Sequence, residues 1–106
     1  MNEDGKRFIR YASTENGNRN TLYVCVPEEG EELYFGIARC NAKHDNFEKR
    51  KGRMIARNRA IKALSENIVV KDAEEEFYVS SNNGLYGCAS KEHLGKVFKY
   101  FYGLDS

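Results

Sequence analysis

Three short segments rich in β-branched and aromatic residues follow one another early in the chain, with turn-forming residues between them. The segments occupy residues 8–12, 22–26 and 33–40, and the turns occupy 14–20 and 28–30. Strands joined by short turns pair as antiparallel neighbours. This arrangement constrains the fold most strongly, because it predicts a three-stranded meander before any helix begins.

Two later segments have the residue spacing of helices. The first runs from a cap at Asp45 or Asn46 to about Glu66, or begins near Gly52, because glycine is unfavourable inside a helix. The second runs from Ser90 to about residue 102, and its apolar side chains recur at one-turn spacing as Leu94, Val97, Phe98 and Phe101. We expect both helices to pack on one face of the sheet.

A second strand pair is predicted between the two helices. Residues 77–80 and 85–88 are β-rich and enclose the pair Asn83-Gly84, which is typical of a tight hairpin. The predicted order is therefore β-β-β-α-β-β-α, an α+β fold with a mostly antiparallel sheet.

The length and composition indicate one small domain. The chain has 106 residues, so we expect a single domain over 1–106 with a loose end at residues 1–5. It contains no apolar run long enough to span a membrane and no secretory signal pattern. Three cysteines are an odd number, which argues against a secreted disulfide framework and favours the reducing cytoplasm.

The net charge of +1 conceals a strong segregation of charge. Eight of the 17 basic residues lie in one segment: Lys43, Lys49, Arg50, Lys51, Arg53, Arg57, Arg59 and Lys62. Two acidic clusters balance them: Glu28, Glu29, Glu31 and Glu32, then Asp72, Glu74, Glu75 and Glu76. A basic segment of this kind attracts phosphates or acidic protein surfaces, and it also forms ordinary solvated helix faces.

Two arginines of the first helix have an ambiguous position. On a helical projection Arg53 and Arg57 fall within the arc of Met54, Ile61 and Leu64, which Ala56, Ala60 and Ala63 extend. The small residues Gly52, Ala56, Ala60 and Ala63 permit close approach of this helix to another surface, most simply the sheet. Their stems can lie along the sheet with the guanidinium groups paired to acidic side chains. Alternatively, they form a fork for phosphate or for a partner's carboxylates.

The same segment carries a resemblance to a group of known proteins. The pattern resembles a segment of small proteins encoded by bacteriophages and mobile elements: Asp45-x-Phe47-x4-Gly52-Arg53-x-Ile55-Ala56-x-x-Arg59-Ala60. It covers about a quarter of the chain. The resemblance implies a phage accessory protein, with host takeover, counter-defence or nucleic-acid handling as its class of role.

A weaker resemblance concerns the order of elements. Three strands that lead into a basic loop and an Ala-rich helix are similar to the β-β-β-α part of double-stranded RNA-binding domains. In that family the basic residues that open the helix contact phosphates across a groove. The resemblance implies that role for the matching positions Lys49, Arg50, Lys51 and Arg53.

No catalytic, metal or cofactor signature is complete. Cys40, His44, Cys88 and His93 include the residue types that zinc prefers, but neither half has the close cysteine pair of a zinc motif. Both common glycine-rich nucleotide-binding patterns are absent. We therefore expect no enzyme activity, no metal and no cofactor.

Tyrosines on the predicted strands add a possible stacking surface. If Tyr11, Tyr23, Tyr34, Tyr78 and Tyr86 share a solvent-facing side of the sheet, they form a platform for bases of a single strand. The alternative is that they cover the sheet or contact a partner.

Together these features predict a non-enzymatic, phage-type small protein that binds nucleic acid. The residues predicted to contact it are Lys49, Arg50, Lys51, Arg53, Arg57, Arg59 and Lys62. The alternative is a protein-interaction module that inhibits or adapts an oppositely charged host protein. A homodimer is compatible with both interpretations.

Overall fold

The computed structural model describes residues 5–15, 17–41, 48–66, 77–79 and 85–104. The elements, in chain order, are β1 (Gly5–Ser13), β2 (Asn18–Pro27), β3 (Glu32–Asn41), α1 (Lys49–Ser65), β4 (Phe77–Val79), β5 (Tyr86–Ser90), a single 3₁₀ turn (Lys91–His93) and α2 (Leu94–Gly103). The predicted α+β class and the order β-β-β-α-β-β-α are confirmed.

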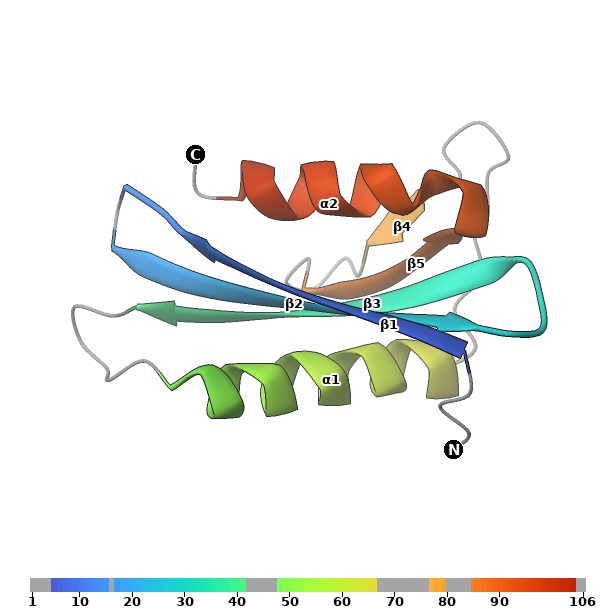
Figure 1. Ribbon diagram of the computed structural model, residues 1–106, viewed down its shortest axis with the longest axis horizontal. Coiled ribbons are helices and arrows are strands. Elements are labelled where there is room, and N and C mark those ends of the chain that lie inside the picture. The colour runs from blue at the N-terminus through green and yellow to red at the C-terminus, as the bar shows by residue number, and fades with distance from the viewer. Residues whose placement is uncertain (1–4, 16, 42–47, 67–76, 80–84, 105–106) are drawn as a thin grey trace.

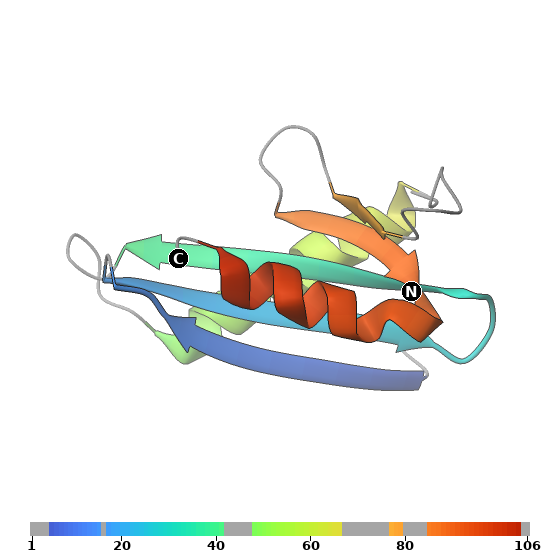
Figure 2. The same ribbon diagram turned by 90° about the horizontal axis from the view of Figure 1, so that it is seen from above.

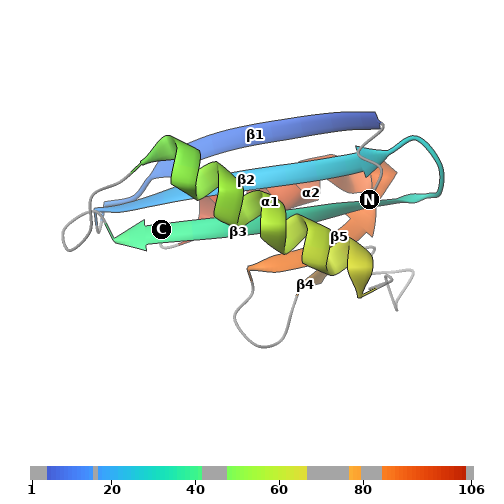
Figure 3. The same cartoon turned by 90° about the horizontal axis from the view of Figure 1, so that it is seen from below.

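One antiparallel sheet holds all five strands, in the order β1-β2-β3-β5-β4. The first three strands form the predicted meander. Gly17 and Gly30 turn the chain between them with φ of 84° and 86°, a left-handed conformation that favours glycine. α1 then carries the chain across the sheet, so that β4 forms the far edge and β5 returns between β4 and β3 (Figures 1 and 3).

The two helices lie on opposite faces of the sheet (Figure 1). The prediction that both cover one face is therefore wrong. The physical reason is that the central strands are apolar on both sides: Leu22 and Val24 of β2 belong to the core under α2, whereas Tyr23 and Cys25 belong to the core under α1. A strand buried on both faces requires a covering layer on each.

The core under α2 is the larger of the two. Val97 and Phe101 of α2 are buried against Leu33, Phe35 and Ile37 of β3, with the neighbouring side chains of β2 completing the cluster. The predicted apolar stripe of this helix is thus confirmed as its packing face. Figure 2 shows α2 lying along the sheet on this side.

Several element ends differ from the prediction. β1 begins at Gly5, which pairs with Pro27, and α1 begins at Lys49, with Glu48 as its N-cap residue. The proposed caps Asp45 and Asn46 lie outside the described residues, as do the short apolar run 68–70 and the hairpin turn 81–84. The antiparallel pairing of β4 with β5 confirms the two strands of that hairpin.

A membrane-spanning helix is not found in the described parts of the chain, where neither α1 nor α2 is long and apolar enough to cross a bilayer.

Candidate functional site

α1 packs on the sheet through its smallest side chains. The buried residues of this helix are Gly52, Ala56, Ala60 and Ala63. Small side chains let a helix axis come close to the strands, and they leave the larger side chains to spread outwards. The predicted apolar arc is therefore confirmed at Ala56, Ala60 and Ala63, and it is wrong at Met54, which is 57% exposed.

The approach is closest at Gly36 in the middle of β3. A β-carbon at this position would overlap the backbone of α1, at the carbonyl oxygen of Ala56 and the amide nitrogen of Ala60. A glycine on β3 and a row of small residues on α1 therefore act together to place the helix directly on the strands.

The seven basic residues predicted from the sequence are divided between two sides of α1. Lys49, Arg53 and Arg57 follow one another at four-residue spacing and form a β1-side row, with Arg50 on its outer margin. Lys51, Arg59 and Lys62 form a β3-side row along the opposite flank. The structure thus does not gather all seven residues on one surface.

Tyr11 of β1 organises the start of the β1-side row. The Arg53 guanidinium donates to the Tyr11 hydroxyl at 3.2 Å, and the Lys49 ammonium lies 4.9 Å from the centre of the Tyr11 ring. Lys49 and Arg53 are nevertheless exposed, and Arg57 is half-buried. Arg53 and Arg57 therefore flank the packing face rather than lie beneath the helix.

The far part of the β3-side row serves the fold. The Arg59 guanidinium donates to the carbonyl oxygen of Ile37 at 2.5 Å, and burial lowers the pKa of this group. Lys62 lies 5.3 Å from the centre of the Tyr86 ring and 4.0 Å from a carboxylate oxygen of Glu66. These two cations are already held by other groups of the protein.

Four cations remain at the start of α1: Lys49, Arg50, Lys51 and Arg53. All four are exposed, and none of them forms an ion pair with another described residue. We call this set the α1 cation cluster.

The cluster lies at an unusual place on a helix. Lys49, Arg50 and Lys51 are the first three helical residues, the first turn contains no acidic residue, and the N-cap Glu48 makes no side-chain capping bond. The helix macrodipole is positive at this end, so each cation there costs about 0.3–1 kcal/mol of helix stability. The same combination of positive charge and unpaired amide groups favours an anion.

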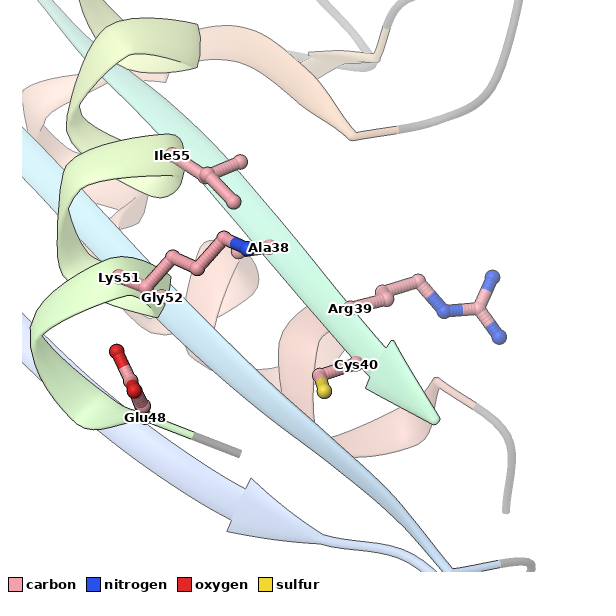
Figure 4. A pocket seen from close by; sticks show the side chains of 7 residues that line it. All are labelled: Ala38, Arg39, Cys40, Glu48, Lys51, Gly52 and Ile55. Atoms are coloured by element: carbon pink, nitrogen blue, oxygen red, sulfur yellow. The ribbon is translucent and has the colours of Figure 1, made fainter. Parts of the chain in front are cut away.

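A hollow of about 460 Å³ adjoins the cluster, between the first turns of α1 and the end of β3 (Figure 4). Lys51 and Ile55 point from the helix towards it, Ala38 and Cys40 line its floor, and the Arg39 side chain points away from the helix. In the described residues the end of β3, from Ala38 on, pairs with β2 alone, because the last hydrogen bond towards β5 is donated by the Ile37 amide to the Leu85 carbonyl oxygen at 2.7 Å.

The predicted tyrosine platform is not formed by the described side chains. The register places Tyr11, Tyr23, Tyr34 and Tyr86 on one face of the sheet, but this is the face that α1 covers. Tyr23, Tyr34 and Tyr86 are less than 10% exposed, which leaves no free ring face for a base. Tyr78 belongs to β4, and its side chain lies outside the described part of the structure.

The cysteines do not gather into a metal site in the described residues. Cys88 of β5 pairs with Tyr34 of β3, six residues along that strand from Cys40. At about 3.3 Å per residue this separation is about 20 Å, which is too far for a shared zinc ion. His44 lies outside the described residues, and no cluster of three candidate ligands is found within them.

Burial also suppresses the reactivity of Cys88. Its side chain is fully buried, and this burial, assisted by the nearby charge of Glu32, raises the pKa of the thiol to about 12. Because only the thiolate is a nucleophile, this cysteine is inert near neutral pH.

The first acidic cluster lies at the other end of the molecule, whereas the second, at Asp72, Glu74, Glu75 and Glu76, falls outside the described residues. The β2–β3 turn carries Glu28, Glu29 and Glu31, and it lies near the last turn of α1, where Leu64 and Glu32 line a hollow of about 370 Å³. The molecule is 40 Å long, and Figure 1 shows this turn at the opposite end from the start of α1. The basic start of α1 and the acidic β2–β3 turn are therefore separated along the long axis of the molecule.

Comparisons with known proteins identify no relative: no family model, no curated protein and no solved structure matches the chain.

Proposed function

We propose that this protein binds nucleic acid through the α1 cation cluster and that it acts without catalysis. The observation that carries the proposal is the first turn of α1, where three cations occupy the positive end of a helix with no acidic residue among them. Folding alone disfavours this arrangement. A phosphate backbone would relieve it by supplying the missing negative charge.

The four residues of the cluster have the reach that phosphate contacts need. Lys49 and Arg53 are oriented by Tyr11, whereas Arg50 lies on the outer margin of the β1-side row and Lys51 points towards the hollow at the end of β3. Contacts of this kind fix the position of a protein on nucleic acid without reading its sequence. Arg57, Arg59 and Lys62 take a smaller part, because they are partly buried or held by other groups.

Fluorescence anisotropy with short single- and double-stranded DNA and RNA tests the proposal. We expect binding to at least one of the four at low salt, and loss of at least tenfold in affinity in Arg50→Glu/Lys51→Glu. The matched control is Lys96→Glu/Lys99→Glu, which makes the same change in net charge on α2, on the opposite face of the sheet. Equal loss in both variants, or no binding at low salt, would contradict the proposal.

The origin and the location of the protein belong to the same proposal. A phage or mobile-element accessory protein that acts in the cytoplasm agrees with the segment from Asp45 to Ala60 and with the reduced cysteines. Host takeover or counter-defence is the role that we infer for it.

A second candidate, an interaction with an acidic host protein, is favoured by one observation. Met54 is 57% exposed and Ile55 is 36% exposed, both beside Lys51 on the outer side of α1. Apolar side chains next to a cation suit a protein surface better than they suit a phosphate backbone. A stoichiometric complex that survives nuclease treatment and is lost in Met54→Asp/Ile55→Asp would establish this alternative.

A further inference from the structure

β1 is a long edge strand whose outer side is open. It runs for nine residues at the end of the sheet, and none of the other described elements lies beyond it (Figures 2 and 3). Ile9, at the centre of the strand, is 36% exposed. An edge strand presents unpaired backbone groups that can bind another strand.

The hydrogen bonds of the β1–β2 hairpin show which backbone groups of β1 point away from β2. The Thr14 amide donates to the Asn18 carbonyl oxygen at 2.9 Å, and the pairing continues without a bulge to Gly5. Hydrogen-bonded positions alternate along an antiparallel pair. The backbone amide and carbonyl groups of even-numbered residues of β1 therefore point towards β2, and those of odd-numbered residues point away from it. The Arg10 guanidinium donates to the Ile9 carbonyl oxygen at 2.9 Å at an exposed position. This agrees with an Ile9 carbonyl group that points away from β2.

The sequence of β1 suits pairing with its own copy about Ile9. This centre is the only one at which all nine residues overlap. It places Arg7 opposite the partner's Tyr11 and Phe8 opposite the partner's Arg10, so that no two like charges face each other. A centre at Arg10 would place Arg10 opposite its copy, and a centre at Phe8 would place Lys6 opposite the partner's Arg10, so both would oppose like charges.

We infer that β1 pairs with β1 of a second copy, antiparallel and centred on Ile9, so that two chains share one ten-stranded sheet. The amide and carbonyl groups of Ile9, which point away from β2, form the centre of the new ladder. The Ile9 carbonyl oxygen can still accept the Arg10 bond, because it has two lone pairs.

The pairing has a consequence for the α1 cation cluster. The two-fold axis is perpendicular to the shared sheet, since paired residues of antiparallel strands point to the same face. Both α1 helices therefore lie on one face, and each begins near its own β1, as Figure 3 shows for one chain. The two β1-side rows face each other across the junction, with Ile9 and Tyr11 of both chains between them.

The mass in solution, measured by light scattering after size-exclusion chromatography, tests the inference without nucleic acid. We expect wild type at twice the chain mass of 12.2 kDa and Ile9→Pro at the single mass. Proline removes the outward amide but no bond to β2, and edge strands tolerate it there. The control Ile9→Thr keeps both the amide and the β-branched shape, and it should remain dimeric. A monomeric wild type, or a dimer that Ile9→Pro leaves unchanged, would overturn the inference.

Cysteine cross-linking provides a second test that does not depend on how Ile9→Pro folds. In a Cys40→Ser background, Ile9→Cys places two thiols opposite each other, with α-carbons about 5.5 Å apart, within the range of a disulfide. Mild oxidation should then give a covalent dimer that reductant reverses. Tyr11→Cys in the same background should not cross-link, because the two Tyr11 positions are four residues apart in this register. Cross-linking of both or of neither would overturn the register.

Discussion

Gly36 of β3 lies directly against the backbone of Ala56 in α1, with no space between them for a β-carbon. This one contact determines how low the helix lies on the sheet. It therefore also determines that the packing face of α1 consists of small residues and that its cations extend from the flanks.

Gly36→Ala should destabilise the protein by about 1–3 kcal/mol, because the added methyl group must displace helix backbone rather than a flexible side chain. Urea unfolding measures the change. The control is Gly95→Ala in α2, where nothing lies within 4 Å of the new methyl group. That variant should gain about 0.5–1 kcal/mol, since alanine is the better helix former. Equal effects at the two glycines would show that the contact between Gly36 and the backbone of α1 leaves room for a methyl group.

The α1 cation cluster should reduce the stability of the helix that carries it. Arg50→Glu/Lys51→Glu replaces two cations at the positive end of the macrodipole by anions, so the free energy of unfolding should rise by about 1 kcal/mol. Thermal and urea unfolding without ligand measure this change, and Arg50→Gln/Lys51→Gln should give about half of it. A fall in stability would mean that these cations serve the fold.

Cys88 should make stability depend on pH in the alkaline range. Its pKa is raised from 9.0 to about 12 by burial and by the charge of Glu32. Between these values the unfolded chain has lost a proton that the folded chain retains, so the free energy of unfolding falls as pH rises. The contribution is fully present below pH 9.0 and is lost as pH approaches about 12.

Urea unfolding near pH 8 and near pH 10 measures this effect. The loss of stability in wild type should exceed the loss in Cys88→Ala by about 1 kcal/mol. Burial also raises the pKa values of Tyr34 and Tyr100, and both tyrosines are present in the two proteins. The contribution of Tyr100 cancels in the comparison, whereas part of the Tyr34 shift comes from the charge of Cys88 and is lost with it, so the difference reports Cys88 together with its effect on Tyr34. Equal losses would contradict the assignment to Cys88.

The sequence was sufficient to predict the elements of the fold, because each has a local cause. The meander follows from β-rich runs with glycine turns, and the face of α2 follows from Leu94, Val97, Phe98 and Phe101. The placement of the helices was not predictable in this way. The placement depends on whether the side of the sheet that carries Tyr23 and Cys25 is buried or faces solvent. Both residue types occur at buried and at partly exposed positions, so the sequence does not decide between one covered face and two.

The site was predicted only in part, for a related reason. The basic residues of α1 are predicted from charge alone. The predicted packing arc includes Ala56, Ala60 and Ala63, which are buried, but also Met54, which is exposed. The close contact at Gly36 requires the small side chains of Ala56 and Ala60 at the centre of the packing face, and no local pattern distinguishes these positions from Met54. Contacts between residues 42 apart in sequence, such as Arg53 with Tyr11, have no local signal at all.

The salt dependence of nucleic-acid affinity tests the central claim most directly. Each phosphate contact contributes about −0.9 to the slope of log K against log salt for duplex DNA, and about −0.7 for a single strand. If the α1 cation cluster contacts phosphates, Arg50→Gln/Lys51→Gln should make the slope shallower by about 1.4–1.8, while Lys96→Gln/Lys99→Gln leaves it unchanged. An unchanged slope in the first variant would show that the start of α1 does not contact the phosphate backbone.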